Sequence, residues 1–191
     1  MHSSYFNEWR VEAWQPLVHV CRRWRSLVLA SPRRLNLRLY CTPKTPVRDR
    51  LDVWPALPLV VGGSMAFSSG TDNIIAALGQ NNRICQVDLD LAGWQLKEVL
   101  ATMQVPFPEL TDLRLFSDGD TMPVTPDSFL DGSAPRLRFF EMTSIQFPGL
   151  PKLLFSATHL VTLRVRSAHF LSRTTPAKIS KSLRVRKSAG K

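Results

Sequence analysis

The residue types that most often carry catalysis or bind metal ions are scattered along this chain. Its four histidines lie far apart and form neither an HExxH motif nor a histidine–cysteine zinc pattern. The three cysteines, Cys21, Cys41 and Cys85, form no closely spaced pair, and each lies among apolar residues. This distribution predicts no metal site and no catalytic cluster. It also predicts reduced thiols, as in cytoplasmic or nuclear proteins.

One glycine-containing segment has the composition of a phosphate-binding loop. It runs VVGGSMAFSSGTDNII from Val60 and places its glycines between an expected strand and an expected helix. A phosphate-binding loop would need GxGxxG or a Gly-Lys-Ser/Thr ending, because those spacings bring backbone N–H groups around the phosphates. The segment has neither, and no serine stands in a GxSxG elbow. The sequence therefore predicts a plain connection, no cofactor, and a protein that is not an enzyme.

Three arginines surround a tryptophan in the segment VCRRWRSLVL, a composition that could serve nucleic-acid binding. On a helix, Arg22, Arg23 and Arg25 point in different directions, whereas a surface that follows phosphates would align them. The formal net charge is +10, but seven lysines and arginines and no acidic residue lie from Ser167 onward. The preceding residues are thus close to neutral. We interpret the three arginines as a solvated rim and do not expect nucleic acid as a partner.

The same segment predicts an amphipathic helix that follows Pro16 and ends before Pro32. Its apolar residues recur at the i, i+3, i+4, i+7 spacing of one helix face, which we expect to be buried. That apolar stripe consists of Leu17, Val20, Cys21, Trp24, Leu27 and Val28. A shorter helix with Phe6 and Trp9 is expected before Pro16, packed on the helix that follows Pro16.

Four segments fit one pattern, apolar-x-x-apolar-x-apolar, without gaps. They are ICQVDL from Ile84, LTDLRL from Leu110, LRFFEM from Leu137 and LVTLRV from Leu160. The intervals between them fall within the period of about 20–29 residues that is typical of leucine-rich repeats. Weaker copies precede them, namely WPALPL from residue 54 and PRRLNL from residue 32. Pro58 has no N–H group for a strand ladder, so we expect its strand to be short or irregular.

The segments between these strands predict helices. TDNIIAALGQ has Asp72 as its expected N-cap and Gly79 as its C-terminal stop, and shorter helices are expected at PDSFL and PKLLFSA. GWQLKEVLATM places four apolar residues on one helix face, namely Leu96, Val99, Leu100 and Met103. Strand and helix alternating at this spacing predict an α/β fold. We expect a parallel sheet, stacked into a curved solenoid with helices on the other side.

The x positions of the pattern should point to the concave face of such a sheet. The alignment stacks them in three rows: Gln86, Asp112, Phe139, Thr162; Asp88, Arg114, Glu141, Arg164; and Asp90, Phe116, Thr143, Arg166. The middle row alternates in charge, so it could be a structural ladder or part of a binding site. Phe116 and Phe139 are candidate partner contacts, unless neighbouring loops cover them. The candidate face is therefore Phe116, Phe139, Asp88, Arg114, Glu141 and Arg164.

The stretch VCRRWRSLVLASPRRLNLRL resembles the third helix of the F-box motif and the link that follows it. The span to Arg166, with GTDNIIAALGQ, LAGWQL and PFPELTDLRL, resembles the F-box and leucine-rich-repeat proteins that are numerous in mushroom-forming fungi. The first F-box helix of that family carries a Leu-Pro signature and contacts the adaptor subunit of a cullin-RING ubiquitin ligase. This signature is missing here. The resemblance implies a partial F-box in residues 1–31 and repeats in 32–166. It would also imply further repeats after Arg166, where the sequence instead has a basic tail in 167–191. We expect this tail to be disordered, or to add a final strand through Leu183 and Val185 of SLRVRK, a near copy of TLRVRS from Thr162.

The function implied by the resemblance is protein interaction. The chain would resemble the substrate-recognition subunit of a cullin-RING ligase, with a substrate protein and the ligase adaptor as partners and with impaired adaptor docking. Two alternatives remain: a ligase-independent leucine-rich-repeat scaffold, and attachment of the basic tail to nucleic acid or a membrane surface. Hydrophobic residues make up 44% of the 191-residue chain, and no apolar run approaches the roughly 20 residues of a membrane span. We expect a cytoplasmic or nuclear protein.

Overall fold

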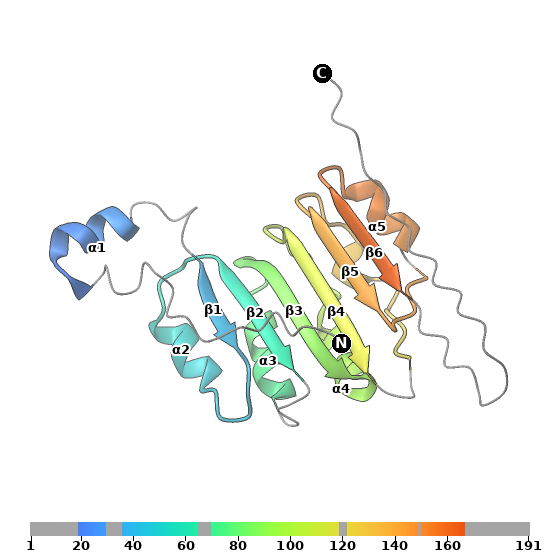
Figure 1. The fold of residues 1–191 in the computed structure, drawn as a ribbon, viewed down its shortest axis with the longest axis horizontal. Coiled ribbons are helices and arrows are strands. Elements are labelled where there is room, and N and C mark those ends of the chain that lie inside the picture. The colour runs from blue at the N-terminus through green and yellow to red at the C-terminus, as the bar shows by residue number, and fades with distance from the viewer. Residues whose placement is uncertain (1–18, 30–35, 65–69, 119–121, 149, 167–191) are drawn as a thin grey trace, which may run out of the picture.

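The centre of the molecule is a six-stranded sheet whose strands follow one another in chain order. The computed structural model of the chain describes residues 19–29, 36–64, 70–118, 122–148 and 150–166. Every neighbouring pair of strands is parallel, as Figure 1 shows. The strands are β1 (Leu37–Tyr40), β2 (Leu59–Ser64), β3 (Ile84–Ala92), β4 (Asp112–Asp118), β5 (Phe139–Thr143) and β6 (Thr162–Arg166). The predicted α/β class with a parallel sheet is confirmed.

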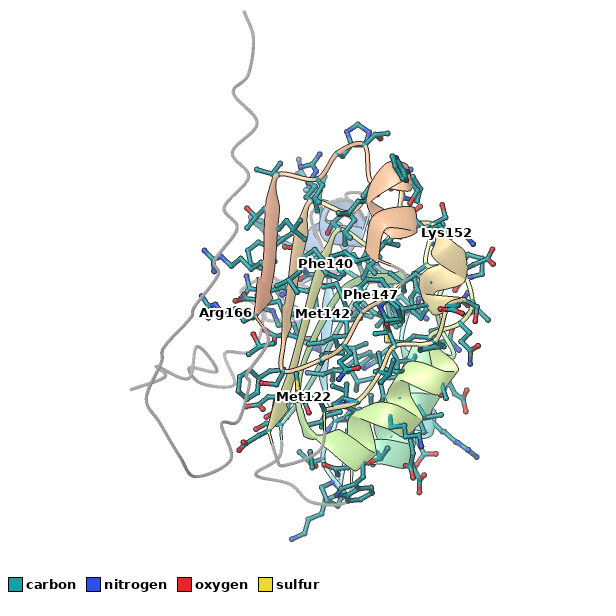
Figure 2. All side chains as sticks on the ribbon, turned by 90° about the vertical axis from the view of Figure 1, so that its right-hand side faces the viewer. Met122, Phe140, Met142, Phe147, Lys152 and Arg166 are labelled. Carbon is teal, nitrogen blue, oxygen red and sulfur yellow. The ribbon has the colours of Figure 1, made fainter. Side chains whose placement is uncertain are left out.

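Helical segments connect the strands, because a parallel neighbour can be reached only by a crossover. They are α2 (Val47–Val53), α3 (Thr71–Leu78), α4 (Gly93–Thr102), the 3-10 helix η3 (Phe129–Gly132) and α5 (Leu150–Ser156), whereas α1 (Arg22–Leu29) precedes β1. Seen along the sheet edge in Figure 2, α4, η3 and α5 lie on one side of the sheet. No helix in the described part of the chain is long and apolar enough to cross a membrane.

The core lies between the sheet and these helices. Alternate residues of each strand point to it, so Val87, Leu89 and Leu91 of β3 are buried while Asp88 and Asp90 between them are only half-buried. Phe140 and Met142 of β5 point from the sheet toward the helices in Figure 2. The four residues predicted to form the apolar face of α4, from Leu96 to Met103, are fully buried. The apolar faces of the strands and of the helices therefore pack together in one core.

The first two strands lie further along the chain than the repeat pattern predicted. The pattern aligned Leu57 of WPALPL with Val87 of β3. In the structure Val61 pairs with Val87, and on its other side with Leu39. The placement of WPALPL and PRRLNL is therefore wrong. Apolar residues are so dense from Leu57 to Val61 that several registers fit the pattern. Pro58 decides between them, because it cannot donate to a ladder and so lies just before β2.

The expected helix ends are partly correct. Gly79 is the C-terminal cap of α3, as predicted, but Gly70 occupies the N-cap and Asp72 lies exposed in the first turn. The helix expected at PDSFL is only the short 3-10 helix η3. Helix α2 was not expected from the sequence. Short helices depend mainly on the packing around them, which local sequence does not report.

Helix α1 lies apart from the sheet in Figure 1, and its apolar side is exposed. Trp24 and Leu27 of α1 are 48% and 58% exposed, and Val20 (64%) and Cys21, which precede the first residue of α1, are exposed as well. The expectation of a buried stripe is wrong for these four residues. Helical periodicity shows which side chains share a face, but it does not show whether another element covers that face.

Some predictions concern residues that the structure does not describe. Leu17, the side chain of Val28 and the helix expected before Pro16 lie outside the described ranges. The tail from residue 167 onward lies outside them too, so its predicted disorder and the division of the chain at residues 31 and 166 stay predictions.

Candidate functional site

The pairing register brings the predicted charged row together on four neighbouring strands. Asp88 of β3 pairs with Arg114 of β4, Arg114 with Glu141 of β5, and Glu141 with Arg164 of β6. The two flanking rows have the pairing that the gapless alignment predicted. We call these four residues the charged row, and the side of β3–β6 on which they stand the charged face.

The charged face lies opposite the helices. Val87, Leu113 and Phe140 are buried on the helix side of the sheet, and side chains alternate between the two faces of a strand. Arg166, which shares the alternation of Glu141 and Arg164, lies on the side away from α5 in Figure 2. Hydrogen-bonded strands on a packed core therefore hold the charged row in place.

Phe139 lies between two arginines of the charged row. The guanidinium carbon of Arg114 is 4.4 Å from the centre of the Phe139 ring, and that of Arg164 is 5.5 Å from it. Cations within about 6 Å of an aromatic centroid are attracted to the ring face. Phe139 is half-buried, so part of the ring stays accessible beside the two cations. The predicted aromatic contact is thus one part of an arginine–phenylalanine–arginine cluster.

Glu141 forms ion pairs with both arginines of β6. Its carboxylate oxygens lie 3.7 Å from an Arg164 nitrogen and 3.8 Å from an Arg166 nitrogen. Both distances exceed the normal length of a charge-assisted hydrogen bond, and one carboxylate is shared by two guanidinium groups. The side chains of Arg164 and Arg166 are 39% and 51% exposed. These arginines keep donor capacity at the surface.

The opposite end of the charged row is acidic. Burial raises the pKa of Asp88; the cation of Arg114 opposes this shift, and the nearby charges of Glu141 and Asp90 add to it. Burial also raises the pKa of Tyr40, which a hydrogen bond with Ser64 partly offsets. Because Asp88 and Asp90 stand on β3 and Arg164 and Arg166 on β6, the charged face is acidic over β3 and becomes basic toward β6.

The predicted charge ladder is interrupted at Arg114. Within the described residues, the ion pairs found in the charged row link Glu141 with Arg164, and no such pair involves Arg114. The Nε atom of Arg114 is buried and has no hydrogen-bond partner in this part of the chain. The guanidinium of Arg114 lies instead over the ring of Phe139.

Two features of this face were not predicted. Arg166 reaches Glu141 although it pairs in register with Thr143. The signal was present, because long side chains can reach the diagonal neighbour on the next strand. Tyr40 approaches Asp88 and Asp90 from β1. The sequence analysis missed Tyr40 because the repeat pattern placed the first two strands too early in the chain. Phe116 is half-buried in register with Asp90 and Thr143, as predicted.

The cysteines lie apart from the charged row. Burial raises the pKa of Cys41 to about 12, so its thiol is protonated at neutral pH. Burial also raises the pKa of Cys85, whose Sγ lies 3.2 Å from the carbonyl oxygen of Leu59. The described residues contain no group of three or more histidine, cysteine or carboxylate side chains that could hold a metal ion.

Comparisons with protein families, with curated proteins and with solved structures find no match for this chain.

Proposed function

We propose that this chain is a protein-interaction module whose charged face binds a partner protein, and that it serves as a substrate-recognition part of a cullin-RING ubiquitin ligase. The observation that carries the proposal is Phe139 held between Arg114 and Arg164 on the face opposite the helices. Aromatic side chains, including phenylalanine, and arginine are enriched in the buried centres of protein interfaces, where most binding energy is concentrated. In this proposal the six strands are the repeats of a leucine-rich-repeat solenoid, as their chain order and the sequence period suggest.

The mechanism is recognition without covalent chemistry. Each contact residue stands on a strand whose neighbours fix its position, so little conformational freedom is lost when a partner binds. The partner would cover the Phe139 ring and exclude water around the guanidinium groups, which strengthens their interactions. Asp88 and Glu141, one on each side of Arg114, would then favour a partner with a matching charge pattern.

The exposed side of α1 supports attachment to the ligase adaptor. Trp24 and Leu27 lie on one side of α1, Val20 lies two residues before the helix begins, and each of the three is at least 48% exposed. In the resemblance to the F-box, this helix corresponds to the third helix, whereas the missing first helix carries the main adaptor contact, so we expect the attachment to be weak. We propose that the apolar side of α1 contacts the adaptor while the charged face holds the substrate.

Site-specific photocrosslinking tests the charged face. Replacing Phe139 with p-benzoylphenylalanine in the full chain should crosslink a partner protein in cells, and the added change Arg164→Glu should abolish the adduct. The same crosslinker at Phe155, which is 87% exposed on α5, is the matched control and should not give that adduct. A pattern of adducts that is identical at the two positions would contradict the proposal.

Binding to the purified ligase adaptor tests the second part. Surface plasmon resonance should show binding that Trp24→Ala and Leu27→Ala weaken and that Phe139→Ala leaves unchanged. Fusing an F-box first helix with the Leu-Pro signature in front of the chain should tighten the binding. Crosslinking at Phe139 together with no adaptor binding in either form would favour a ligase-independent scaffold.

A further inference from the structure

Within the described residues, no strand pairs with the backbone groups along the outer edge of β6. Strand β6 pairs with β5, and no other described strand pairs with its second edge. The N–H of Thr162 donates to the carbonyl of Arg138, and the carbonyl of Arg166 accepts from Ser144, so these residues face β5. In a parallel pair, alternate residues of a strand bond the same neighbour. The N–H and C=O groups of Leu163 and Val165 therefore point to the outer edge.

The helix side of β6 is also less complete than that of the inner strands. Leu113 and Leu115 of β4 are fully buried, whereas Leu163 and Val165, their equivalents on β6, are only half-buried. One more strand with apolar residues beside Leu163 and Val165 would bury them as the inner strands are buried. The edge therefore fits an extended segment with an alternating apolar pattern.

The charge on the other side of β6 decides which segment fits. Arg164 and Arg166 are 39% and 51% exposed and share the single carboxylate of Glu141 at 3.7 and 3.8 Å. Residues on an added strand would lie beside these arginines, at the spacing of directly opposed side chains. Opposite charges at such positions attract, and like charges are unfavourable. Acidic residues are therefore favoured there.

This charge pattern disfavours the two occupants that the chain itself could supply. The segment SLRVRK in the tail has the correct apolar alternation at Leu183 and Val185, but it would place Arg184 and Arg186 beside the arginines of β6. Edge-to-edge pairing with β6 of a second copy would bring Arg164 and Arg166 of both copies together. An acidic segment from another protein meets neither repulsion.

We infer that the outer edge of β6 binds an extended acidic segment of a partner protein as a seventh strand of the sheet. In this segment, Glu or Asp residues face Arg164 and Arg166 and alternate with apolar residues that cover Leu163 and Val165. The inference rests on the proposed function, because it specifies the chemistry of the partner and the place where part of it binds. Backbone hydrogen bonds supply affinity, and the side chains on the two faces supply specificity.

The test uses the full chain and synthetic peptides. A fluorescein-labelled peptide with the sequence GSEVEVEVGS should raise its fluorescence anisotropy on binding, with an affinity that falls as salt increases. The peptide GSKVKVKVGS should bind at least tenfold more weakly, because its charges oppose those of the arginines. The peptide GSEVEVEVGS with backbone N-methyl groups on its central glutamate and on the valine that follows keeps all three glutamates. It loses a backbone N–H that faces β6 in either strand direction, so it should bind at least tenfold more weakly as well.

Matched variants locate the site. Arg166→Gln should weaken binding of the glutamate peptide about two- to fivefold, the size expected for one charge pair beside a strand. Arg136→Gln removes the same charge from another exposed ion pair, the one with Glu109, and should leave the affinity unchanged. Glu141→Gln should strengthen binding about twofold, because it frees both arginines. Circular dichroism of each variant shows whether the sheet is retained.

Four results would overturn the inference. They are equal binding of the N-methylated and unmethylated glutamate peptides, equal effects of Arg136→Gln and Arg166→Gln, amide-exchange protection of residues 182–186 in the free chain, and concentration-dependent dimers that the peptide does not dissociate. The third would assign the edge to the tail of this chain, and the fourth to a second copy. If the glutamate peptide fails to bind while Phe139 still crosslinks its partner, the edge inference falls and the proposed function stands.

Discussion

The contact between Phe139 and Arg114 should contribute measurably to the stability of the sheet. The two side chains lie on neighbouring strands, with 4.4 Å between the guanidinium carbon and the ring centre. We predict that the changes Phe139→Leu and Arg114→Met are not additive in their effect on the free energy of unfolding. Leucine keeps an apolar side chain without the ring, and methionine keeps much of the arginine stem without the charge.

The expected coupling follows from the geometry and burial of the pair. Cation–π contacts contribute about 0.5–1 kcal/mol at exposed sites and about 2 kcal/mol when desolvated. Both side chains are half-buried, and the Nε atom of Arg114 is buried. We therefore expect a coupling of about 1–2 kcal/mol. The contact of Arg164 with the same ring is longer, at 5.5 Å, and the Arg164 side chain is 39% exposed, so its coupling should be about 0.5 kcal/mol.

Urea unfolding followed by circular dichroism measures these couplings through double-mutant cycles. Each cycle compares the chain, two single variants and the double variant. Pairing Phe139→Leu with Arg136→Met is the control, since Arg136 pairs with Glu109 and is exposed. This control pair should be additive within about 0.3–0.5 kcal/mol. A coupling between Phe139 and Arg114 no larger than that of the control would refute the reasoning.

Three further predictions concern burial and charge. Phe140→Ala should lower the free energy of unfolding by about 3–5 kcal/mol in urea titration, because Phe140 is fully buried, whereas Phe155→Ala should change it by less than about 0.5 kcal/mol. Trp24→Ala should also change it by less than about 0.5 kcal/mol, and a larger loss would mean that α1 is packed. Burial raises the pKa of Asp88 above its unfolded value, so its carboxylate destabilises the fold at neutral pH, and stability returns as pH falls through the raised pKa. Asp88→Asn should therefore raise the midpoint of urea unfolding at pH 7, with the gain vanishing below about pH 4; no gain at pH 7 would contradict this.

The sequence determined the strands whose period was unambiguous. From Ile84 onward, apolar residues recur at a fixed spacing with polar residues between them, and a shift of one residue would place charges in the core. The register of β3 to β6 and the three rows on the charged face follow from that constraint. The buried face of α4 was predictable for the same reason.

The positions of the first two strands were not determined in this way. Between Leu57 and Val61 almost every residue is apolar, so the pattern cannot select a register. In the folded chain, β2 begins at Leu59 because its neighbours on both sides and Pro58 fix the pairing. Long-range hydrogen bonds therefore supplied information that the local pattern lacked.

The exposure of α1 and the contacts within the charged face depend on tertiary structure. Periodicity placed Trp24 and Leu27 on one helix face, but only the arrangement of the chain shows that this face is exposed. The sequence likewise placed Arg114 between two carboxylates, yet its guanidinium stacks on Phe139. A row of side chains follows from strand pairing alone. Which neighbour each long side chain contacts depends on burial and on the competing side chains around it in three dimensions.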